Sequence, residues 1–165
     1  MISLVVHAVL GLTVIGWLVA SNPRVFAKPA GGAWLSPLEC VYYFVGIASI
    51  ALGWYFNIHF VADAAGQGNL VQGPGSYPHF LRLQFANPAA GSGAEDYLIA
   101  NVILLPLFTI VDGYRRGLRR PWLYFAASFF TSFSFPLAWY FATIERQRRH
   151  AQGQPADAPT QTVST

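Results

Sequence analysis

The chain has 165 residues, of which 54% are hydrophobic and only 10% are charged, and its mean hydropathy is +0.39. Soluble domains carry about a quarter charged residues, and a chain of this size cannot bury so much apolar surface inside itself. Composition therefore argues against a water-soluble domain and predicts a protein that faces lipid. The single cysteine, Cys40, excludes an intramolecular disulfide and a cysteine-clustered metal site.

Four apolar stretches occupy most of the chain, and each approaches the ~20 residues that a membrane-spanning helix needs. They cover residues 2–20, 38–61, 97–112 and 122–143. The predicted fold class is therefore all-α, a polytopic membrane protein with four transmembrane helices in an antiparallel bundle. We expect one transmembrane domain over 1–149, followed by a disordered tail over 150–165, which is polar and aperiodic.

The first stretch is expected to remain in the protein as a helix. No basic segment precedes it, and it is longer than the apolar core of a typical secretory signal. The following segment contains prolines and the pair Gly31-Gly32, which is the chemistry of a loop. Pro37 then suits the first turn of the second helix.

The longest connection, between the second and third stretches, contains a short helix signature. Ser76 is a plausible N-cap, Pro78 fits an early helical position, and Asn87-Pro88 is a stop signal. The pattern predicts a short helix over 77–86 that lies at the membrane interface, with its aromatic side chains in the acyl boundary.

The last two stretches are joined by the segment DGYRRGLRRP, which is so short that the two helices must be antiparallel neighbours. Pro121 suits the start of the last helix. Pro106 and Pro136 lie inside the two stretches, where each removes a backbone hydrogen bond and predicts a kink.

Membrane orientation is hard to infer, because basic residues flank both ends of the last stretch. The loops 21–37 and 113–121 hold six Lys and Arg residues, against four at the opposite face. The positive-inside rule therefore favours a cytoplasmic location for these two loops, with both termini on the other side of a bacterial inner membrane.

From Phe80 onward, the chain resembles a family of small bacterial membrane proteins known as domain of unknown function 2834. The matching segments are FLRLQFANPAA at 80–90, DYLIA at 96–100, VDGYRRGLRRPWLY at 111–124 and FSFPLAWYFATIERQRR at 133–149. The resemblance extends back through GWYFNIHFV in the second helix and so covers about 40–149, with the first helix as an addition. It implies a topology and carries no activity with it.

The second predicted helix has two distinct faces. Gly46, Ser49 and Gly53 follow helical spacing and form a small-residue stripe, which lets another helix approach closely. On the other face, Tyr55 and His59 are four residues apart and form a polar ladder. The ladder either anchors the helix end at the interface or contributes to a functional site.

Alternating helix direction gathers several polar side chains on one side of the membrane. The candidate pocket residues are His7, Tyr55, Asn57, His59 and Asn101. If their faces converge, they form a polar pocket that can hold a lipid head group, an isoprenoid alcohol or a proton. The alternative is that these groups only join helices by hydrogen bonds.

The opposite side collects a surplus of arginines. The candidate residues for lipid or partner binding are Asp112, Arg115, Arg116, Arg119 and Arg120. Asp112 and Arg116 are four residues apart and can pair, while the other arginines suit an anionic lipid or an acidic partner. Positive-inside orientation alone is the simpler explanation, and nucleic-acid binding is not expected.

These features lead to two hypotheses for function. The first is a non-enzymatic accessory subunit of a larger inner-membrane complex, such as a lipid transporter. The second is a small membrane enzyme or carrier that binds a lipid or an isoprenoid in the polar pocket. No catalytic residue and no cofactor is predicted, and the four histidines show none of the spacings typical of metal sites.

Overall fold

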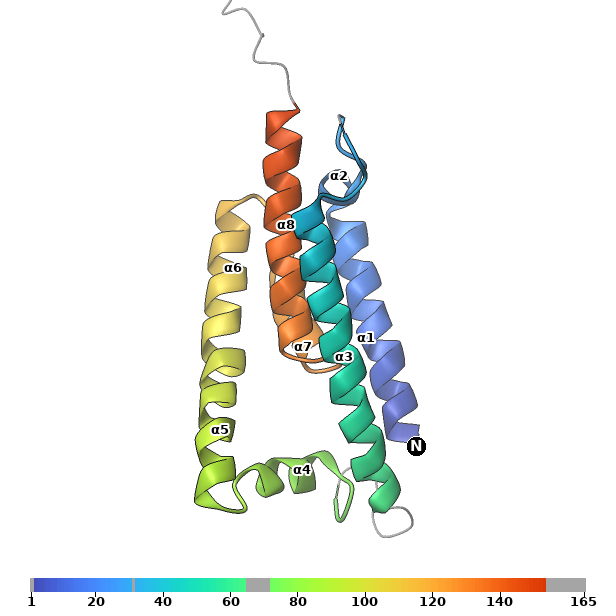
Figure 1. Ribbon diagram of the computed structural model, residues 1–165, viewed down its shortest axis with the longest axis vertical. Coiled ribbons are helices and arrows are strands. Elements are labelled where there is room, and N and C mark those ends of the chain that lie inside the picture. The colour runs from blue at the N-terminus through green and yellow to red at the C-terminus, as the bar shows by residue number, and fades with distance from the viewer. Residues whose placement is uncertain (1, 31, 65–71, 154–165) are drawn as a thin grey trace, which may run out of the picture.

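A computed structural model describes residues 2–30, 32–64 and 72–153, and these residues are helical with no β-strand among them. Three helical segments are long and apolar enough to cross a membrane, over Leu4–Ser21, Pro37–Asp63 and Pro88–Arg115. The protein is therefore an all-α, multi-pass membrane protein. Its long helices run side by side, as Figure 1 shows, and a short helix crosses one end.

The first two spans follow the sequence closely. Helix α1 covers Ile2–Ser21 and helix α3 covers Pro37–Asp63, and the short helix α2, Pro23–Phe26, lies between them. Helix α3 begins with a capping box, in which Ser36 accepts from the Glu39 backbone N–H and Glu39 accepts from the Ser36 backbone N–H.

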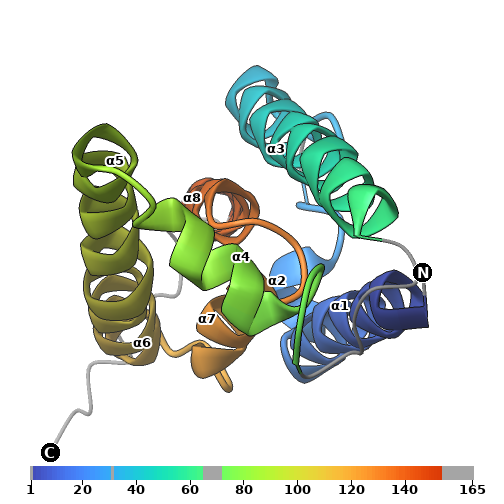
Figure 2. The ribbon, with the colours of Figure 1, turned by 90° about the horizontal axis from the view of Figure 1, so that it is seen from below.

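Helix α4, Tyr77–Gln84, is the short helix that the sequence predicts. Ser76 caps it by accepting a hydrogen bond from the backbone N–H of His79. The helix lies across the end of the bundle, between α5 and α1 (Figure 2). This placement closes one end of the molecule with the aromatic side chains of α4.

The third span begins at Pro88, whereas the sequence analysis starts it at residue 97. It consists of α5, Pro88–Leu98, a π-helical turn η1, Ile99–Leu104, and α6, Leu105–Arg115. The Asn87 side chain accepts from the Ala90 backbone N–H, so the Asn-Pro pair, which the sequence analysis gives as a stop signal, begins α5, while α4 ends at Gln84. The kink predicted at Pro106 is a wider turn, because the π-helical segment ends just before the proline and accommodates its missing N–H.

The fourth predicted helix, 122–143, is wrong as a single span. The segment is two helices, α7 over Trp122–Ser128 and α8 over Ser134–Gln152, with a turn between them. Ser132 Oγ accepts from the Phe135 backbone N–H at the turn. Pro136 lies in the first turn of α8, where its missing N–H costs nothing, and it therefore starts a helix instead of kinking one.

The short helix α7 and the longer helix α8 form a hairpin that enters the bundle and returns to the same end. Seven residues of α7 rise only about 10 Å, which is about a third of the hydrocarbon core. At the turn, Ser132 Oγ lies 2.9 Å from Ser49 Oγ, near the middle of α3. At the far end of α8, Arg146 binds Glu39 in the first turn of α3. Helix α8 thus runs back beside α3, as Figure 1 shows.

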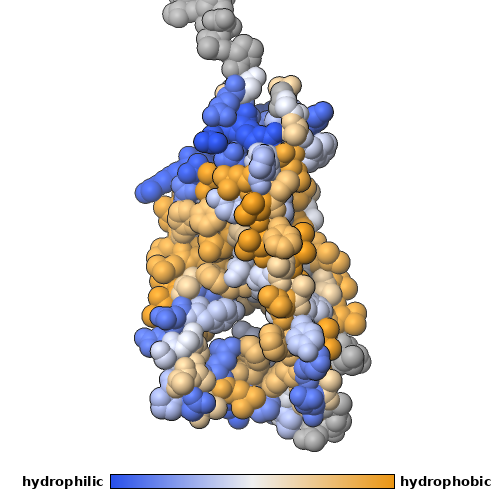
Figure 3. Space-filling view, in the orientation of Figure 1, coloured by the Kyte–Doolittle hydropathy of each residue, from blue (hydrophilic) through white to orange (hydrophobic). Residues whose placement is uncertain are grey.

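The hairpin changes the charge balance between the two ends of the molecule. The end of α8 lies on the same side as loops 21–37 and 113–121, so the predicted placement of the C-terminal arginines on the opposite side is wrong. Nine of the ten Lys and Arg residues now lie at one end, and Arg82 alone lies at the other. Figure 3 shows this charged end above a broad apolar band. Helix α8 continues through His150 to Gln152, and 154–165 lie outside the described residues.

Cysteine labelling from either side of the membrane tests this topology. In a background with Cys40→Ser, we expect Arg115→Cys and Arg148→Cys to react with an impermeant maleimide from the same side. Arg82→Cys should react only from the other side. If Arg148→Cys reacted from the same side as Arg82→Cys, the result would support four spans and contradict the hairpin.

The buried core lies at the arginine-rich end. Its members are Leu18, Leu118, Leu123, Tyr124, Phe135, Trp139 and Tyr140. Within it, the hydroxyls of Tyr124 and Thr143 lie 2.6 Å apart and satisfy each other across the hairpin. Below the hairpin turn, none of the described helices continues the core between α3 and α5, and this half of the molecule is hollow.

Candidate functional site

The hollow half holds a cavity of about 710 Å³ beneath the hairpin. The turn between α7 and α8 forms its roof, α3 and α5 with η1 form its walls, and Tyr77 and Phe80 of α4 close it from below. In Figure 3 it is visible as an opening in the lower half of the molecule. The cavity therefore occupies the half of the membrane that the hairpin leaves unfilled.

One side of the cavity is open towards lipid. Phe44, Leu52 and Phe56 of α3 line it, and their side chains are 73%, 64% and 67% exposed. Apolar side chains with this exposure face acyl chains in a membrane protein. A hydrophobic molecule can therefore pass from the bilayer into the cavity without crossing water.

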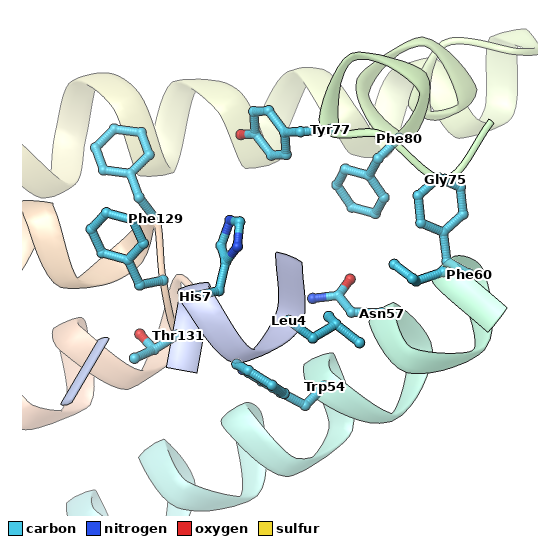
Figure 4. A pocket seen from close by; sticks show the side chains of 12 residues that line it. Leu4, His7, Trp54, Asn57, Phe60, Gly75, Tyr77, Phe80, Phe129 and Thr131 are labelled. Carbon is cyan, nitrogen blue, oxygen red and sulfur yellow. The ribbon is translucent and has the colours of Figure 1, made fainter. Parts of the chain in front are cut away.

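A smaller hollow of about 110 Å³ adjoins the cavity and extends it towards α1. The two share five lining residues, Asn57, Tyr77, Phe80, Phe129 and Thr131. His7 and Leu4 of α1 belong only to the smaller one, and the His7 ring lies 6.0 Å from the Phe130 ring. Figure 4 shows His7, Asn57 and Tyr77 around this space.

Asn101 is a buried polar residue of the cavity lining whose hydrogen bonding is incomplete. It lies in the π-helical turn and is only 6% exposed. Its Nδ2 donates to the Tyr97 hydroxyl over 3.2 Å, but its Oδ1 accepts no hydrogen bond from the described residues. An unsatisfied amide oxygen in an apolar setting costs about 1–3 kcal/mol, which a ligand with a donor group can recover.

The hydroxyls of the roof are occupied by partners within the protein. Ser128 donates to the Phe125 carbonyl, Thr131 donates to the Ala127 carbonyl, and Ser49 donates to Ser132. Hydroxyls bound in this way satisfy the backbone where the helix breaks. They provide a polar surface for a ligand and are not arranged as activated nucleophiles.

The structure brings together some of the predicted pocket residues and not others. His7, Asn57 and Asn101 line the two adjoining hollows. Tyr55 and His59 do not, because they lie on the outer face of α3, where their ring centroids are 4.4 Å apart at a tilted angle and both residues are exposed. The sequence analysis places them with Asn57, but a helix turns about 200° over two residues, which separates the two sets.

The small-residue stripe of α3 packs against another helix of the same chain. A Cβ on Gly46 would lie 3.1 Å from the Phe135 ring, Ser49 bonds Ser132, and Gly53 lies beside the same serine. Helices α3 and α8 form the most extensive helix contact among the described residues. The stripe therefore holds the hairpin against α3.

At the arginine-rich end, Asp112 and Arg116 form the predicted pair, with Arg116 Nε 2.6 Å from Asp112 Oδ2. The same oxygen accepts from the Tyr140 hydroxyl over 2.7 Å, which ties α6 to α8. The hydrogen bond with Asp112 raises the pKa of Arg116 above its ordinary value. Arg115 and Arg119 are exposed, whereas Arg120 donates to Ser21 Oγ over 3.1 Å.

A buried ionic cluster at this end was not foreseen from the sequence. Glu39 is fully buried and pairs with Arg146 at 3.2 Å and with Arg149. Arg146 also donates to the Ala27 carbonyl and lies over the Trp34 ring. The spacing of Ser36 and Glu39 predicts the helix cap. The ion pairs of Glu39 could not be predicted, because they depend on the hairpin that brings α8 back to the arginine-rich end.

Among the described residues, no three His, Cys, Asp or Glu side chains gather closely enough to hold a metal ion. None of the described residues that line the main cavity is Asp, Glu, Lys or Arg. The site therefore consists of aromatic and aliphatic surface with a few neutral polar groups, which is the character of a site for an uncharged, mostly apolar ligand.

Comparison with known proteins identifies a family. The chain belongs to the family described as "Protein of unknown function DUF2834", whose profile matches residues 41–146. The match begins within α3 and ends at Arg146 in α8, so it contains the hairpin and Asn101, while α1 precedes it. No curated protein and no solved structure matches the chain.

Proposed function

We propose that this DUF2834 protein binds a membrane amphiphile with an uncharged head group in the cavity beneath the α7–α8 hairpin. The observation that carries the proposal is Asn101, a buried residue in the lining of a cavity open to lipid, whose Oδ1 accepts no hydrogen bond from the described residues. Ligands that suit these features are a diacylglycerol, a long-chain alcohol or an isoprenoid alcohol.

The size of the cavity supports a ligand of this kind. Ligand pockets in proteins commonly measure about 300–1,000 Å³, and the cavity of about 710 Å³ falls inside this range. A volume of this size accepts a head group and part of one or two chains. The exposed Phe44 and Phe56 mark the side through which the remaining chain can extend into the bilayer.

The neutral character of the described cavity lining favours a neutral head group. A phosphate inside this space would lose its hydration without gaining a cationic partner, at a cost of several kcal/mol. A hydroxyl loses much less, and it can donate to Asn101 Oδ1. The hydroxyl side chains of the hairpin turn add a polar rim near the same depth.

Binding without a reaction fits the site better than catalysis does. The roof hydroxyls donate to backbone carbonyls or to each other, and none of the described lining residues is a carboxylate that could act as a general base. We therefore assign the cavity to a carrier or lipid-binding protein. It needs no cofactor for this role.

The hypothesis of an accessory subunit is the second candidate function. Part of its support was the small-residue stripe, and Gly46, Ser49 and Gly53 contact α8 and its turn within this chain. A lipid-holding protein can still serve a larger lipid-transport complex in the membrane. Purification of the tagged protein from its native membrane, followed by mass spectrometry, tests for a stoichiometric partner.

The charge distribution supports an orientation in a bacterial inner membrane. Nine of ten Lys and Arg residues lie at one end, which the positive-inside rule places in the cytoplasm, with loops 21–37 and 113–121. The cavity then lies in the outer leaflet half of the membrane. A ligand drawn from that leaflet would meet Asn101 near mid-depth.

Native mass spectrometry of the purified protein tests the proposal. We expect the wild type to retain one neutral amphiphile, and we expect Asn101→Leu to bind added diacylglycerol about tenfold more weakly, because the acceptor is lost. Tyr97→Phe is the matched control, since it removes the internal partner of Asn101 Nδ2 and keeps the Oδ1 acceptor. Unchanged affinity in Asn101→Leu would contradict the proposal.

A further inference from the structure

A groove of about 500 Å³ lies at the arginine-rich end, far from the cavity beneath the hairpin. One wall consists of the end of α1 and the start of α2, from Ser21 to Val25. The other wall is the loop between α6 and α7, at Gly117 and Arg119. Gly117 has a φ of +73°, which is the left-handed conformation that glycine adopts without strain and that turns the loop towards α2.

A buried asparagine fixes the two walls to each other. Asn22 is 6% exposed, and its Nδ2 donates to the Leu18 carbonyl at 3.0 Å and to the Arg119 carbonyl at 2.9 Å. Its Oδ1 accepts from the Arg119 backbone N–H over 2.7 Å. The Asn22 amide group and its oxygen are therefore both engaged, and the two hydrogen bonds with the Arg119 backbone join the walls across the groove base.

The groove carries two arginines that have no acidic partner among the described residues. Arg24 on one wall and Arg119 on the other are exposed, and neither side chain forms an ion pair or hydrogen bond with the described residues. None of the described lining residues is Asp or Glu. Other arginines nearby are engaged, since Arg116 pairs with Asp112 and Arg120 binds Ser21.

Two tryptophans place the groove at the level of the lipid head groups. Trp17 and Trp122 meet edge to face at 5.4 Å, and the Arg120 guanidinium lies 5.3 Å from the Trp17 ring centre. Trp is enriched at the membrane interface, where its ring reaches the acyl boundary and its N–H reaches water. The groove adjoins this pair, because Ser21 lies one helical turn after Trp17 in α1 and Arg119 lies three residues before Trp122.

We propose that this groove binds a phosphate group, held between the guanidinium groups of Arg24 and Arg119. Guanidinium groups match phosphate oxygens with paired N–H donors, and the interaction is charge-assisted. An anionic phospholipid in the adjacent leaflet presents such a group at this depth, and its chains can lie along α1 beside Trp17. The proposal does not depend on the ligand of the cavity.

Binding of three probes to the purified full-length protein tests the groove. The probes are phosphatidylglycerol, diacylglycerol, which lacks the phosphate, and inorganic phosphate. We expect phosphatidylglycerol to bind, and we expect Arg24→Gln and Arg119→Gln each to weaken it by about tenfold. Arg115→Gln is the matched control, because it removes an exposed positive charge at the same end but outside the groove.

The outcomes separate the possible sources of the phosphate. Displacement of phosphatidylglycerol by an equal concentration of inorganic phosphate would assign the site to the free anion, and failure to displace it would assign the site to the lipid. An equal loss of affinity in Arg115→Gln would overturn the proposal, since general surface charge would then explain binding. Unchanged affinity in both groove variants, measured on correctly folded protein, would overturn it as well.

Discussion

Replacing Glu39 with glutamine is expected to lower the free energy of unfolding by about 3–5 kcal/mol, because it leaves the Arg146 charge buried without a counter-ion. Glu39 is fully buried, and the Arg146 side chain is only 2% exposed. Arg149 loses its carboxylate partner in the same change. Glutamine still accepts the Ser36 N–H, so the helix cap survives and the substitution isolates the ionic cluster.

Thermal unfolding in mild detergent, followed by tryptophan fluorescence, measures this effect. Trp34 lies beside the Arg146 guanidinium and is one of the five tryptophans that contribute to this signal. Glu145→Gln is the matched control, because its partner Arg148 is 64% exposed and such pairs contribute at most about 1 kcal/mol. Equal shifts for the two variants would contradict the structural role of the buried cluster.

Replacing Gly46 with leucine is expected to separate the hairpin from α3 and to destabilise the protein by about 1–3 kcal/mol or more. A Cβ at this position would already lie 3.1 Å from the Phe135 ring and 3.6 Å from Ala138 Cβ. The remaining atoms of a leucine side chain have no space between the two helices. Close contact through small residues is what joins helices in a membrane.

Two other glycines provide controls for this prediction. A Cβ on Gly16 would meet no described atom within 4 Å, so Gly16→Leu should leave the unfolding temperature unchanged. Gly53→Leu should fold, because the nearest atom to its Cβ would be 3.9 Å away, but its side chain should fill part of the cavity and weaken diacylglycerol binding. A Gly46→Leu variant as stable as Gly16→Leu would contradict the observed α3–α8 contact.

Helix ends with strong capping chemistry could be predicted from the sequence. Ser36 and Pro37 fix the start of α3, and Ser76 fixes the start of α4. The start of α5 could not be placed, because Gly91 and Gly93 resemble loop residues. Asn87 nevertheless caps α5, so the pair Asn87-Pro88, which is predicted as a stop signal, is the start of the next helix.

The hairpin could not be predicted from apolar content. Residues 122–143 are mostly apolar and contain no charged residue, and hydropathy does not distinguish one continuous helix from two helices joined by a turn. The local clue was Ser132, four residues before Pro136, since Ser132 accepts from the Phe135 N–H and Pro136 tolerates the first helical turn. That clue fits both a kink and a helix start, and tertiary contact with Ser49 favours the second.

For the candidate site, too, the individual residues could be predicted from the sequence but their arrangement in space could not. His7, Asn57 and Asn101 could be named because polar groups inside apolar stretches are conspicuous. The cavity that these residues line could not be predicted, because it exists only where the hairpin does not fill the membrane half below its turn. The pairing of Glu39 with Arg146 was missed for the same reason, since it requires α8 to return to the start of α3.

Photo-crosslinking is the most direct test of the cavity as a lipid site. A long-chain alcohol with a diazirine group near its hydroxyl is added to the protein in its membrane, and the labelled peptides are mapped by mass spectrometry. We expect labels on the segments that line the cavity, around Asn101 and Phe133, in preference to Val5 and Leu12, which α1 exposes to lipid. Equal labelling of α1 and the cavity segments would contradict the account.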